Sequence, residues 1–503
     1  MAEKSLMETN QRGAPPPFAT RDGQRGAPPP FATPHAPSMP QGAELEACGC
    51  ESLSRAKLLR RAAYAAMPGR GLPAIETGMP TPAGTGLTRR SFMSRSAGLA
   101  MAVYGANKLG WDAFEEGIAA AAQAPSQPVL VSVFCEGGAD SLTVLAPTGH
   151  PRYELLRPNL KVLPTVGTIF SEDPTLRWHP AASGLATLHG EGKVSVFPAI
   201  GYTDANQSHF TSRHFWEVGA TDPGGRIGWL GRYLDQHGAR DNPLQGLSLG
   251  WELSPSLAAG NVPVATISKP DDYDFWAPGV WGAMEQPMLK AIGGLGLGAD
   301  TSDPGLAQAR DAAAATGRLQ AQMQPFQAGY SSPQGVAYPA NSEFAGRLSA
   351  LAAMLAAGLP LRCVSIEAAG GYDTHSNQQA SLPANLKLTS DSLLAFQRDL
   401  EARGLADRVL VHVWSEFGRR PRENGTGTDH GAAGASFLIG SQVRGQMVGG
   451  FPGLVSLDSD DNLRTTSDYR GLYRGLLEQW FGVDAAPIIP NAASFAAPQL
   501  LRA

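Results

Sequence analysis

The sequence predicts an α/β protein, a three-layer sandwich with a mostly parallel central sheet. Its apolar runs of strand length are continuous rather than alternating, as expected for parallel strands buried on both faces. Stretches with helical periodicity separate these runs. Three of the runs are followed by glycine and a carboxylate. Open α/β sheets keep their chemistry at the carboxyl ends of the strands, so these motifs predict one composite polar site.

Five apolar runs are expected to form strands of this sheet. They lie at 128–135, 194–199, 361–367, 408–414 and 435–439. Four segments carry apolar residues at helical spacing, at 305–327, 341–357, 385–403 and 468–481. The third of these helices is expected to end before Gly404, because glycine commonly terminates helices. The stretch 252–304 is rich in Gly and Pro and is expected to be an insertion or a long loop.

Composition excludes several classes of function. The 503-residue chain has a net charge of −5 and no run of Lys or Arg, so nucleic acid and anionic membrane surfaces are not expected partners. No apolar run reaches the roughly 18 residues that a transmembrane helix needs. Cys135 and Cys363 lie inside expected strands and are interpreted as buried apolar residues. Cys48 and Cys50 are too close together for the usual zinc-binding spacing.

The N-terminal region is interpreted as an extension rather than part of the fold. Residues 11–20 recur at 24–33 as an identical Pro-rich repeat. A repeat this short and polar cannot bury a face, so residues 1–87 are expected to be disordered.

A targeting signal is expected to follow at 88–124. It begins with Thr88-Arg89-Arg90-Ser91-Phe92-Met93, which resembles the twin-arginine export signal, and ends with Ala-Gln-Ala at 122–124, which is typical of cleavage sites. The alternative interpretation is a surface helix that starts with two arginines. The export interpretation predicts a partner, the twin-arginine machinery, and an extracytoplasmic or cell-envelope location for the domain at 125–503.

Two of the strand-end motifs offer candidate metal ligands. Gly137-Gly138-Ala139-Asp140 follows the first strand, where Asp140 either binds a metal or caps the next helix. Asp373 and His375 follow Gly370-Gly371, where they either bind a metal or form a hydrogen-bonded turn. A carboxylate and a neutral imidazole are normal ligands for Zn²⁺, Mn²⁺ or Fe.

The third motif combines an acid, an arginine and a histidine. Glu416 and Arg419 follow the strand 408–414, and Glu416 either binds a metal or pairs with Arg419 or Arg420. His430 lies on a loop rich in Gly and Thr with no apolar stripe to join, which favours a ligand or active-site role.

A fourth polar segment, Ser208 to His214, follows the strand 194–199. Ser208 or Thr211 is a candidate nucleophile, and Arg213 is a candidate clamp for an anionic group. The alternative is an ordinary polar helix start. In contrast, the Gly-x-Ser-x-Gly match at 246–250 is not expected to be a nucleophile elbow, because no strand precedes it.

With these motifs the chain resembles a bacterial family catalogued as domain of unknown function number 1501. The shared segments are a Gly-Gly-x-Asp strand end, a Ser-His-Phe segment, Asp-Thr-His-Ser-Asn-Gln, Ser-Glu-Phe-Gly-Arg and Thr-Asp-His-Gly, which occur here at 137–140, 208–210, 373–378, 415–419 and 428–431. The family is in turn similar to the alkaline phosphatase and sulfatase superfamily.

The order of motifs in that superfamily implies roles for the residues of this chain. One metal site would contain Asp373, His375 and His430, and a second would contain Asp140 and Glu416. The nucleophile would lie near Ser208. This chain departs from the superfamily pattern in two ways that bear on these roles. Asp373 and His375 are separated by one residue rather than three, and Phe417 stands where a partner histidine would be.

The resemblance therefore implies an alkaline-phosphatase-like domain that hydrolyses phosphate or sulfate esters with a divalent metal, Zn²⁺, Mn²⁺ or Ca²⁺. In this mechanism Ser208 or Thr211 would attack, while Arg213 or Arg419 would hold an anionic small-molecule ester. The alternative function is a non-catalytic protein that keeps the fold to bind or assemble an envelope component, and the Phe417 departure favours it.

Overall fold

A computed structural model gives the fold of this chain and describes residues 127–271 and 304–502, with a few isolated positions between them. The interpretations of the N-terminal repeat, the twin-arginine motif and the cleavage site lie outside the described residues. Among the helices that the structure describes, none is both long enough and apolar enough to cross a membrane.

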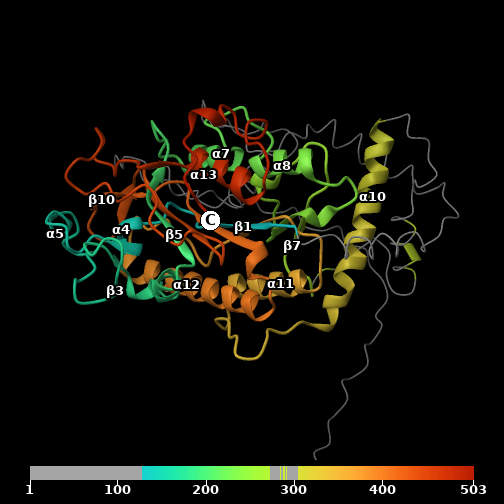
Figure 1. Ribbon diagram of the computed structural model, residues 1–503, viewed down its shortest axis with the longest axis horizontal. Helices are drawn as coiled ribbons and strands as arrows, with labels where there is room; N and C mark the ends of the chain where they lie inside the picture. Colours follow the sequence, from blue (N-terminus) through green and yellow to red (C-terminus); the bar gives the residue numbers. More distant parts are fainter. Residues whose placement is uncertain are drawn as a thin grey trace, which may run out of the picture. The chain divides into compact units, whose positions relative to one another are not determined.

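An eight-stranded sheet forms the centre of the described domain, in the order β13-β5-β12-β9-β1-β8-β6-β7 (Figure 1). Every adjacent pair is parallel except those involving β12, which runs antiparallel to both β5 and β9. The predicted fold class, an α/β sandwich with a mostly parallel sheet, is confirmed. The strands are β1 (Val129–Phe134), β5 (Val194–Gly201), β6 (Gly246–Leu249), β7 (Ala265–Ile267), β8 (Cys363–Glu367), β9 (Val409–Trp414), β12 (Gly434–Ile439) and β13 (Ser467–Asp468).

Continuous apolar sequence produces the central strands because both of their faces are covered. All six residues of β1 and of β9 are buried, and their parallel register pairs Leu130 with Leu410. Val131 belongs to the core on one face of the sheet, whereas Leu130 belongs to the core on the other face.

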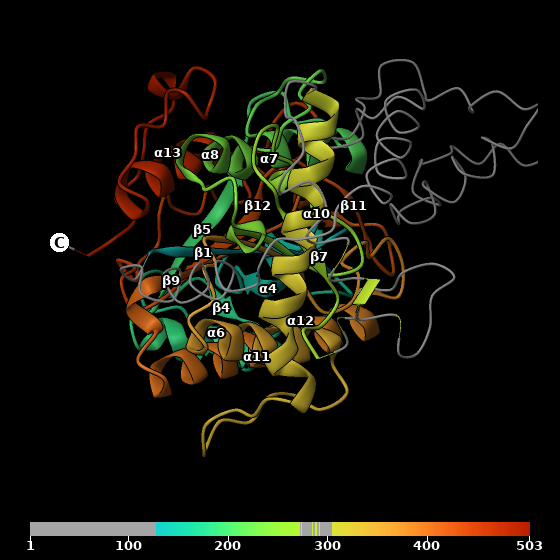
Figure 2. The same cartoon turned by 90° about the vertical axis from the view of Figure 1, so that its right-hand side faces the viewer.

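Helices cover the sheet on both sides, which completes three layers (Figures 1 and 2). One layer contains α6 (Ser183–Gly190), α11 (Glu343–Ala356) and α12 (Gln378–Ala402). The other layer contains α7 (His209–Val218), α8 (Trp229–His237) and α13 (Tyr469–Gly475), with a π-helical turn at Leu476–Trp480. The long α10 (Pro304–Met323) precedes α11 in the chain.

Short elements build the rim around the carboxyl ends of the strands. A hairpin of β10 (Arg419–Glu423) and β11 (Thr428–His430) follows β9 and brings Arg419 opposite His430. The helix α4 (Ser141–Val144) follows β1, and α5 (Tyr153–Leu156) comes next. A separate small sheet contains β2 (Leu145–Ala146), β4 (Arg177–Trp178) and β3 (Thr168–Ile169).

The structure corrects two local expectations and agrees with a third, that residues 246–250 do not form a nucleophile elbow. The stretch 252–304 is not only a loop, because β7 lies within it and pairs with β6 in the main sheet. The helix α12 begins at Gln378, seven residues before the expected start, and includes Pro383. Ser248 lies on the strand β6, where its hydroxyl donates to the Glu252 carbonyl oxygen at 2.8 Å, so it is not at a nucleophile elbow.

Candidate metal site

Three histidine side chains from different segments converge at the carboxyl edge of the sheet. His209 opens α7, His375 lies between β8 and α12, and His430 ends β11. The Nε2 atom of His430 lies 2.8 Å from Nε2 of His209 and 2.9 Å from Nε2 of His375. We call these three residues and Asp373 the edge cluster.

The opposite ring nitrogen of each histidine faces a group that only accepts hydrogen bonds. His209 Nδ1 lies 2.6 Å from a Glu416 carboxylate oxygen, and His430 Nδ1 lies 2.8 Å from the Gln207 carbonyl oxygen. His375 Nδ1 lies 3.4 Å from the Asp429 carboxylate. Each Nδ1 therefore carries a proton and donates it, so that a ring in its neutral form presents the lone pair of its Nε2 atom to the centre of the cluster.

Burial keeps two of these rings neutral at physiological pH. It lowers the pKa of His375 and of His430 below the usual histidine value, and the nearby Arg419 guanidinium lowers both further. Neutral imidazoles are the form that binds metal.

Asp373 supplies a carboxylate to the same point. Its Oδ1 atom lies 3.3 Å from Nε2 of His375, 3.7 Å from Nε2 of His430 and 3.8 Å from Nε2 of His209. Burial alone would raise the pKa of Asp373, but its contacts with His430 and Arg419 lower that pKa to about 2. The cluster therefore presents one carboxylate oxygen and three imidazole lone pairs.

A turn of two glycines holds Glu416 behind His209. The backbone N–H groups of Gly137 and Gly138 donate to the Glu416 carboxylate at 3.0 and 3.1 Å. Both glycines have positive φ, and a Cβ atom on Gly137 would lie 2.3 Å from the backbone nitrogen of Asp373. Burial raises the pKa of Glu416, but the His209 and Gly138 hydrogen bonds outweigh it and lower the pKa. Glu416 is therefore a charged acceptor that orients His209.

The donor set fits a tetrahedral transition metal. Zinc binds histidine nitrogen at about 2.0–2.1 Å, which places tetrahedral ligand atoms about 3.3 Å apart. Nε2 of His430 lies 2.8 and 2.9 Å from the other two imidazoles, and Oδ1 of Asp373 lies 3.3 to 3.8 Å from all three. Among the described residues, His209, Asp373 and His430 form a group whose ligand atoms all lie within 4.8 Å of one another. Three imidazoles fit Zn²⁺ far better than Ca²⁺, which takes six to eight oxygen ligands.

Asp140, a predicted ligand, is bound to other partners. It accepts two hydrogen bonds from the buried guanidinium of Arg157, at 2.6 and 3.0 Å. Thr143 and Gln378 donate to it at 2.7 and 2.6 Å. Burial raises the pKa of Asp140, but the Arg157 guanidinium outweighs burial and lowers it. The structure thus separates Asp140 from the edge cluster, and it places Glu416 behind His209 rather than beside the other ligands.

The two predicted anion clamps are occupied as well. Arg213 donates to Glu217 at 2.8 Å and to Glu136 at 3.0 Å. Arg419 is fully buried and donates to the carbonyl oxygens of Gly138 and Thr428 and to Asp373. Arg419 therefore fixes the position of Asp373.

The two predicted nucleophiles lie at the start of α7, next to His209. Ser208 is the N-cap residue, although its side chain makes no capping hydrogen bond, and Thr211 lies on the first turn. Both are half-buried. A third hydroxyl, Ser212, is fully buried and donates to the Glu416 carbonyl oxygen at 2.6 Å, which joins α7 to the end of β9.

The sequence analysis did not single out His209 as a candidate ligand. The available signal was a histidine next to Ser208 in the polar segment that follows the strand 194–199. Phe417, which replaces the expected histidine, packs with its ring centroid 4.8 Å from those of His209 and His430. The imidazole expected at position 417 is thus supplied from another segment of the chain.

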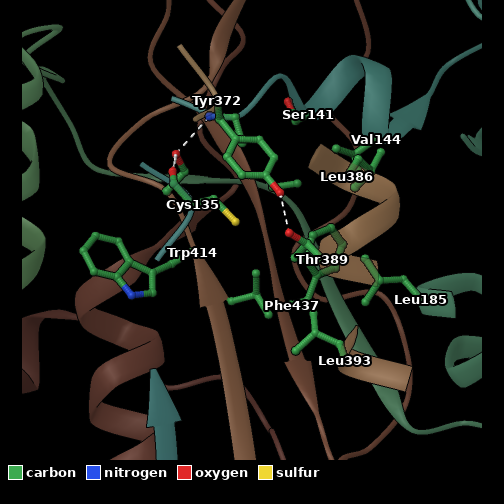
Figure 3. Close-up of a pocket in the computed structure, with 14 residues that line it drawn as sticks. Cys135, Ser141, Val144, Leu185, Tyr372, Leu386, Thr389, Leu393, Trp414 and Phe437 are labelled. Atoms are coloured by element: carbon green, nitrogen blue, oxygen red, sulfur yellow. Dashed lines mark hydrogen bonds between the residues drawn. The ribbon is translucent and has the colours of Figure 1, made fainter. Parts of the chain in front are cut away.

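Beneath the strand ends lies a small apolar cavity of about 30 Å³ (Figure 3). The Tyr372 side chain lines it and hydrogen-bonds through its hydroxyl to Thr389 at 2.8 Å (Figure 3). The Tyr372 backbone N–H donates to the Glu136 carbonyl oxygen at 2.8 Å. Burial raises the pKa of the Cys135 thiol, which also lines the cavity, to about 12. This space is too small for a substrate.

The sequence comparisons agree with the motif pattern. Residues 298–468 match the family described as protein of unknown function, DUF1501. This match includes Asp373, His375, Glu416 and His430 but not His209. The resemblance predicted from the motifs is confirmed over this segment. No curated protein matches the chain.

Solved structures similar to this chain include members of the alkaline phosphatase superfamily, as the sequence resemblance also indicated. One, from Vibrio parahaemolyticus, has 10% identity and a TM-score of 0.32 and covers 80% of this chain and 78% of its own. Another, the phosphonate monoester hydrolase of Silicibacter pomeroyi, has 11% identity and a TM-score of 0.27 over 74% of this chain and 75% of its own. Likenesses this distant carry no argument about activity.

Proposed function

We propose that this chain is a metal-dependent hydrolase of phosphate or sulfate esters, with its metal bound by the edge cluster. One observation supports this most strongly: the Nε2 atoms of three imidazoles face the Asp373 carboxylate, and Nε2 of His430 lies within 3 Å of the other two. Lone pairs at such distances repel one another unless a cation or a proton lies between them. His209, Asp373 and His430, whose ligand atoms all lie within 4.8 Å of one another, would hold a divalent metal, with His375 as a further donor beside Asp373 and His430.

A bound divalent metal would polarise a phosphoryl or sulfuryl oxygen and would provide a nucleophile at neutral pH by lowering the pKa of water. The chain's own groups orient the ligands: Glu416 holds His209, Arg419 holds Asp373, and the Gln207 carbonyl holds His430. His375 is the most exposed member, with 23% of its side chain accessible, so an ester would approach from its side. Water would then replace the alcohol on phosphorus or sulfur, and the alcohol would leave with a proton.

The first experiment is elemental analysis of the purified protein after exposure to Zn²⁺, Mn²⁺ or Ca²⁺ separately, followed by a panel of phosphate and sulfate esters. We expect about one equivalent of Zn²⁺ or Mn²⁺, no stable Ca²⁺ and metal-dependent hydrolysis. His430→Ala should lose both metal and activity. His237→Gln is the matched control, because His237 is an exposed histidine outside the cluster. A wild-type protein that binds no metal would refute the proposal.

A second candidate function is a non-catalytic binding or assembly protein of the cell envelope that keeps the metal for structure. It is favoured by the partners of the residues expected to form a second metal site, since Asp140 pairs with Arg157 and Glu416 with His209. Stoichiometric metal without hydrolysis of any ester in the panel would favour this function over the first.

We also propose that the domain acts outside the cytoplasm after twin-arginine export. The support is the motif at 88–93 and the Ala-Gln-Ala at 122–124. Replacing Arg89 and Arg90 by Lys should retain the protein inside the cell, whereas unchanged export would exclude this pathway.

A further inference from the structure

Carboxylates lie beside the edge cluster along the same edge of the sheet. Glu136 follows β1 and Glu367 ends β8, the neighbouring strand. Both contact Arg213, at 3.0 and 3.7 Å, so the two carboxylates are close to each other. Glu136 also lies within electrostatic range of His209 and Glu416. Glu367 is 61% exposed and is open to an approaching ligand.

The arginine in this group cannot neutralise it. Arg213 shares its single charge among Glu136, Glu367 and the buried Glu217, which it contacts at 2.8 Å. Its guanidinium carbon lies 4.4 Å from the centre of the Phe134 ring, so one face of the group is covered. This side of the edge therefore keeps an excess of negative charge.

On the other side of the cluster one carboxylate faces one guanidinium group. Asp429 is 53% exposed behind His375, and Arg420 lies within electrostatic range of it. Arg420 donates through Nε to the His430 carbonyl oxygen at 3.2 Å. Arg419 is fully buried against Asp373 and backbone carbonyls, so it presents no free donor face to a ligand. In the part of the chain that the structure describes, the carboxylates around the site thus outnumber the guanidinium groups.

We propose that this acidic surround makes the site select esters with one negative charge, such as phosphodiesters, phosphonate monoesters and sulfate esters, over dianionic phosphate monoesters. The inference rests on the proposed function, because it concerns the substrate of the same metal site. Each unscreened carboxylate repels a dianion about twice as strongly as a monoanion, and charges within about 10 Å in a partly buried site interact appreciably. Arg213 and Arg419 are engaged by carboxylates and carbonyl oxygens, so neither compensates for the second charge.

The test compares bis-para-nitrophenyl phosphate with para-nitrophenyl phosphate at about pH 8, where the monoester is a dianion. Metal content is measured first on every sample. Glu367→Gln and Glu136→Gln should each raise kcat/KM for the monoester, on the order of ten-fold for the double variant, and should change the diester much less. High salt should also raise the wild-type kcat/KM for the monoester relative to that for the diester, because salt screens the repulsion between the carboxylates and the dianion.

Asp407→Asn is the matched control. Asp407 is an exposed carboxylate just before β9, at the opposite edge of the sheet, so its removal should leave the diester-to-monoester ratio unchanged. A metal-loaded, active protein whose ratio does not respond to Glu367→Gln, Glu136→Gln or salt would overturn the inference while leaving the proposed function intact. A protein that binds no metal, or hydrolyses neither ester, would remove the proposed function and this inference with it.

Discussion

Two buried arginine–aspartate pairs adjoin the glycine turn after β1, and they differ in what the aspartate has left to offer. Both carboxylate oxygens of Asp140 accept hydrogen bonds, Oδ2 from Arg157, Thr143 and Gln378 and Oδ1 from Arg157. Asp373 is bound by Arg419 as well, but the same Oδ1 atom also faces three imidazoles. The first pair is closed, whereas the second is open toward a ligand.

This difference shows why a strand-end aspartate is an ambiguous signal. Both residues follow parallel strands, near glycines, and both were predicted to bind metal. Their roles diverge because of donors from distant segments: Arg157 belongs to a loop after α5, while the histidines come from α7 and β11. The side chains that surround each carboxylate, rather than its position at the strand end, separate the aspartate held by hydrogen-bond donors from the one that also faces imidazoles.

The largest effect should come from breaking the closed pair. Asp140→Ala leaves the Arg157 guanidinium buried without its counter-ion, which should lower the free energy of unfolding by about 3–5 kcal/mol. Denaturant unfolding monitored by circular dichroism measures this. Any folded fraction should still bind metal, and the exposed Asp407→Asn should change stability by less than about 0.5 kcal/mol. A stable Asp140→Ala protein would argue against a structural role for the pair.

Breaking the open pair should affect the metal instead. Asp373→Ala and His430→Ala each remove one ligand, and we expect metal affinity to fall by more than about 100-fold, beyond the 10–100-fold typical of outer-shell changes. Competition with a chelating dye measures affinity, and circular dichroism should show a folded protein. Retention of metal by both variants would exclude the edge cluster as the binding site.

A smaller effect on metal affinity is expected from changing Glu416, which lies behind His209. Glu416→Gln keeps the size of the side chain but removes the charge that orients His209, so metal affinity should fall by about 10–100-fold. Glu172→Gln is the matched control, since Glu172 lies 3.0 Å from Nε2 of His189 in a carboxylate–histidine pair away from the cluster. Equal losses in the two variants would mean that the effect is not local.

The smallest effect on stability is expected from Glu136, whose carboxylate is paired with Arg213. Burial is the largest influence on Glu136 and raises its pKa to about 7, well above the usual glutamate value. A raised carboxyl pKa means that its contribution to stability is complete below about pH 4.5 and is lost as the pH rises through about 7. Metal-free wild type should therefore lose about 1 kcal/mol more than Glu136→Gln between pH 5 and pH 8, after discounting for its partial exposure. Parallel pH profiles for the two proteins would contradict this.

Much of the sheet was predictable because parallel strands buried on both faces leave continuous apolar runs, as in β1, β8 and β9. The strand β6 was missed because it has only four residues, and β7 because a Gly- and Pro-rich stretch surrounds it. The early start of α12 was missed because Pro383 normally marks a helix boundary.

Convergence of Asp373, His375 and His430 was also predictable, since parallel strands end at one edge. The contribution of His209 was not, because its Nδ1 partner Glu416 lies more than two hundred residues away in sequence. The partners that engage Arg213 and Arg419 were not predictable from the sequence either. Whether an arginine is free depends on which carboxylates and carbonyl oxygens tertiary packing brings to it.

The spacing of the cluster residues along the chain has a consequence for folding. A metal held by His209, Asp373 and His430 would tie together three segments that are far apart in sequence, as a cross-link does. Such a link reduces the conformational entropy of the unfolded chain, and mass action adds stability as the concentration of free metal rises. The midpoint of thermal unfolding would then rise with the concentration of free metal. The atoms of a proposed reaction centre would thus also form a reversible cross-link that stabilises the fold.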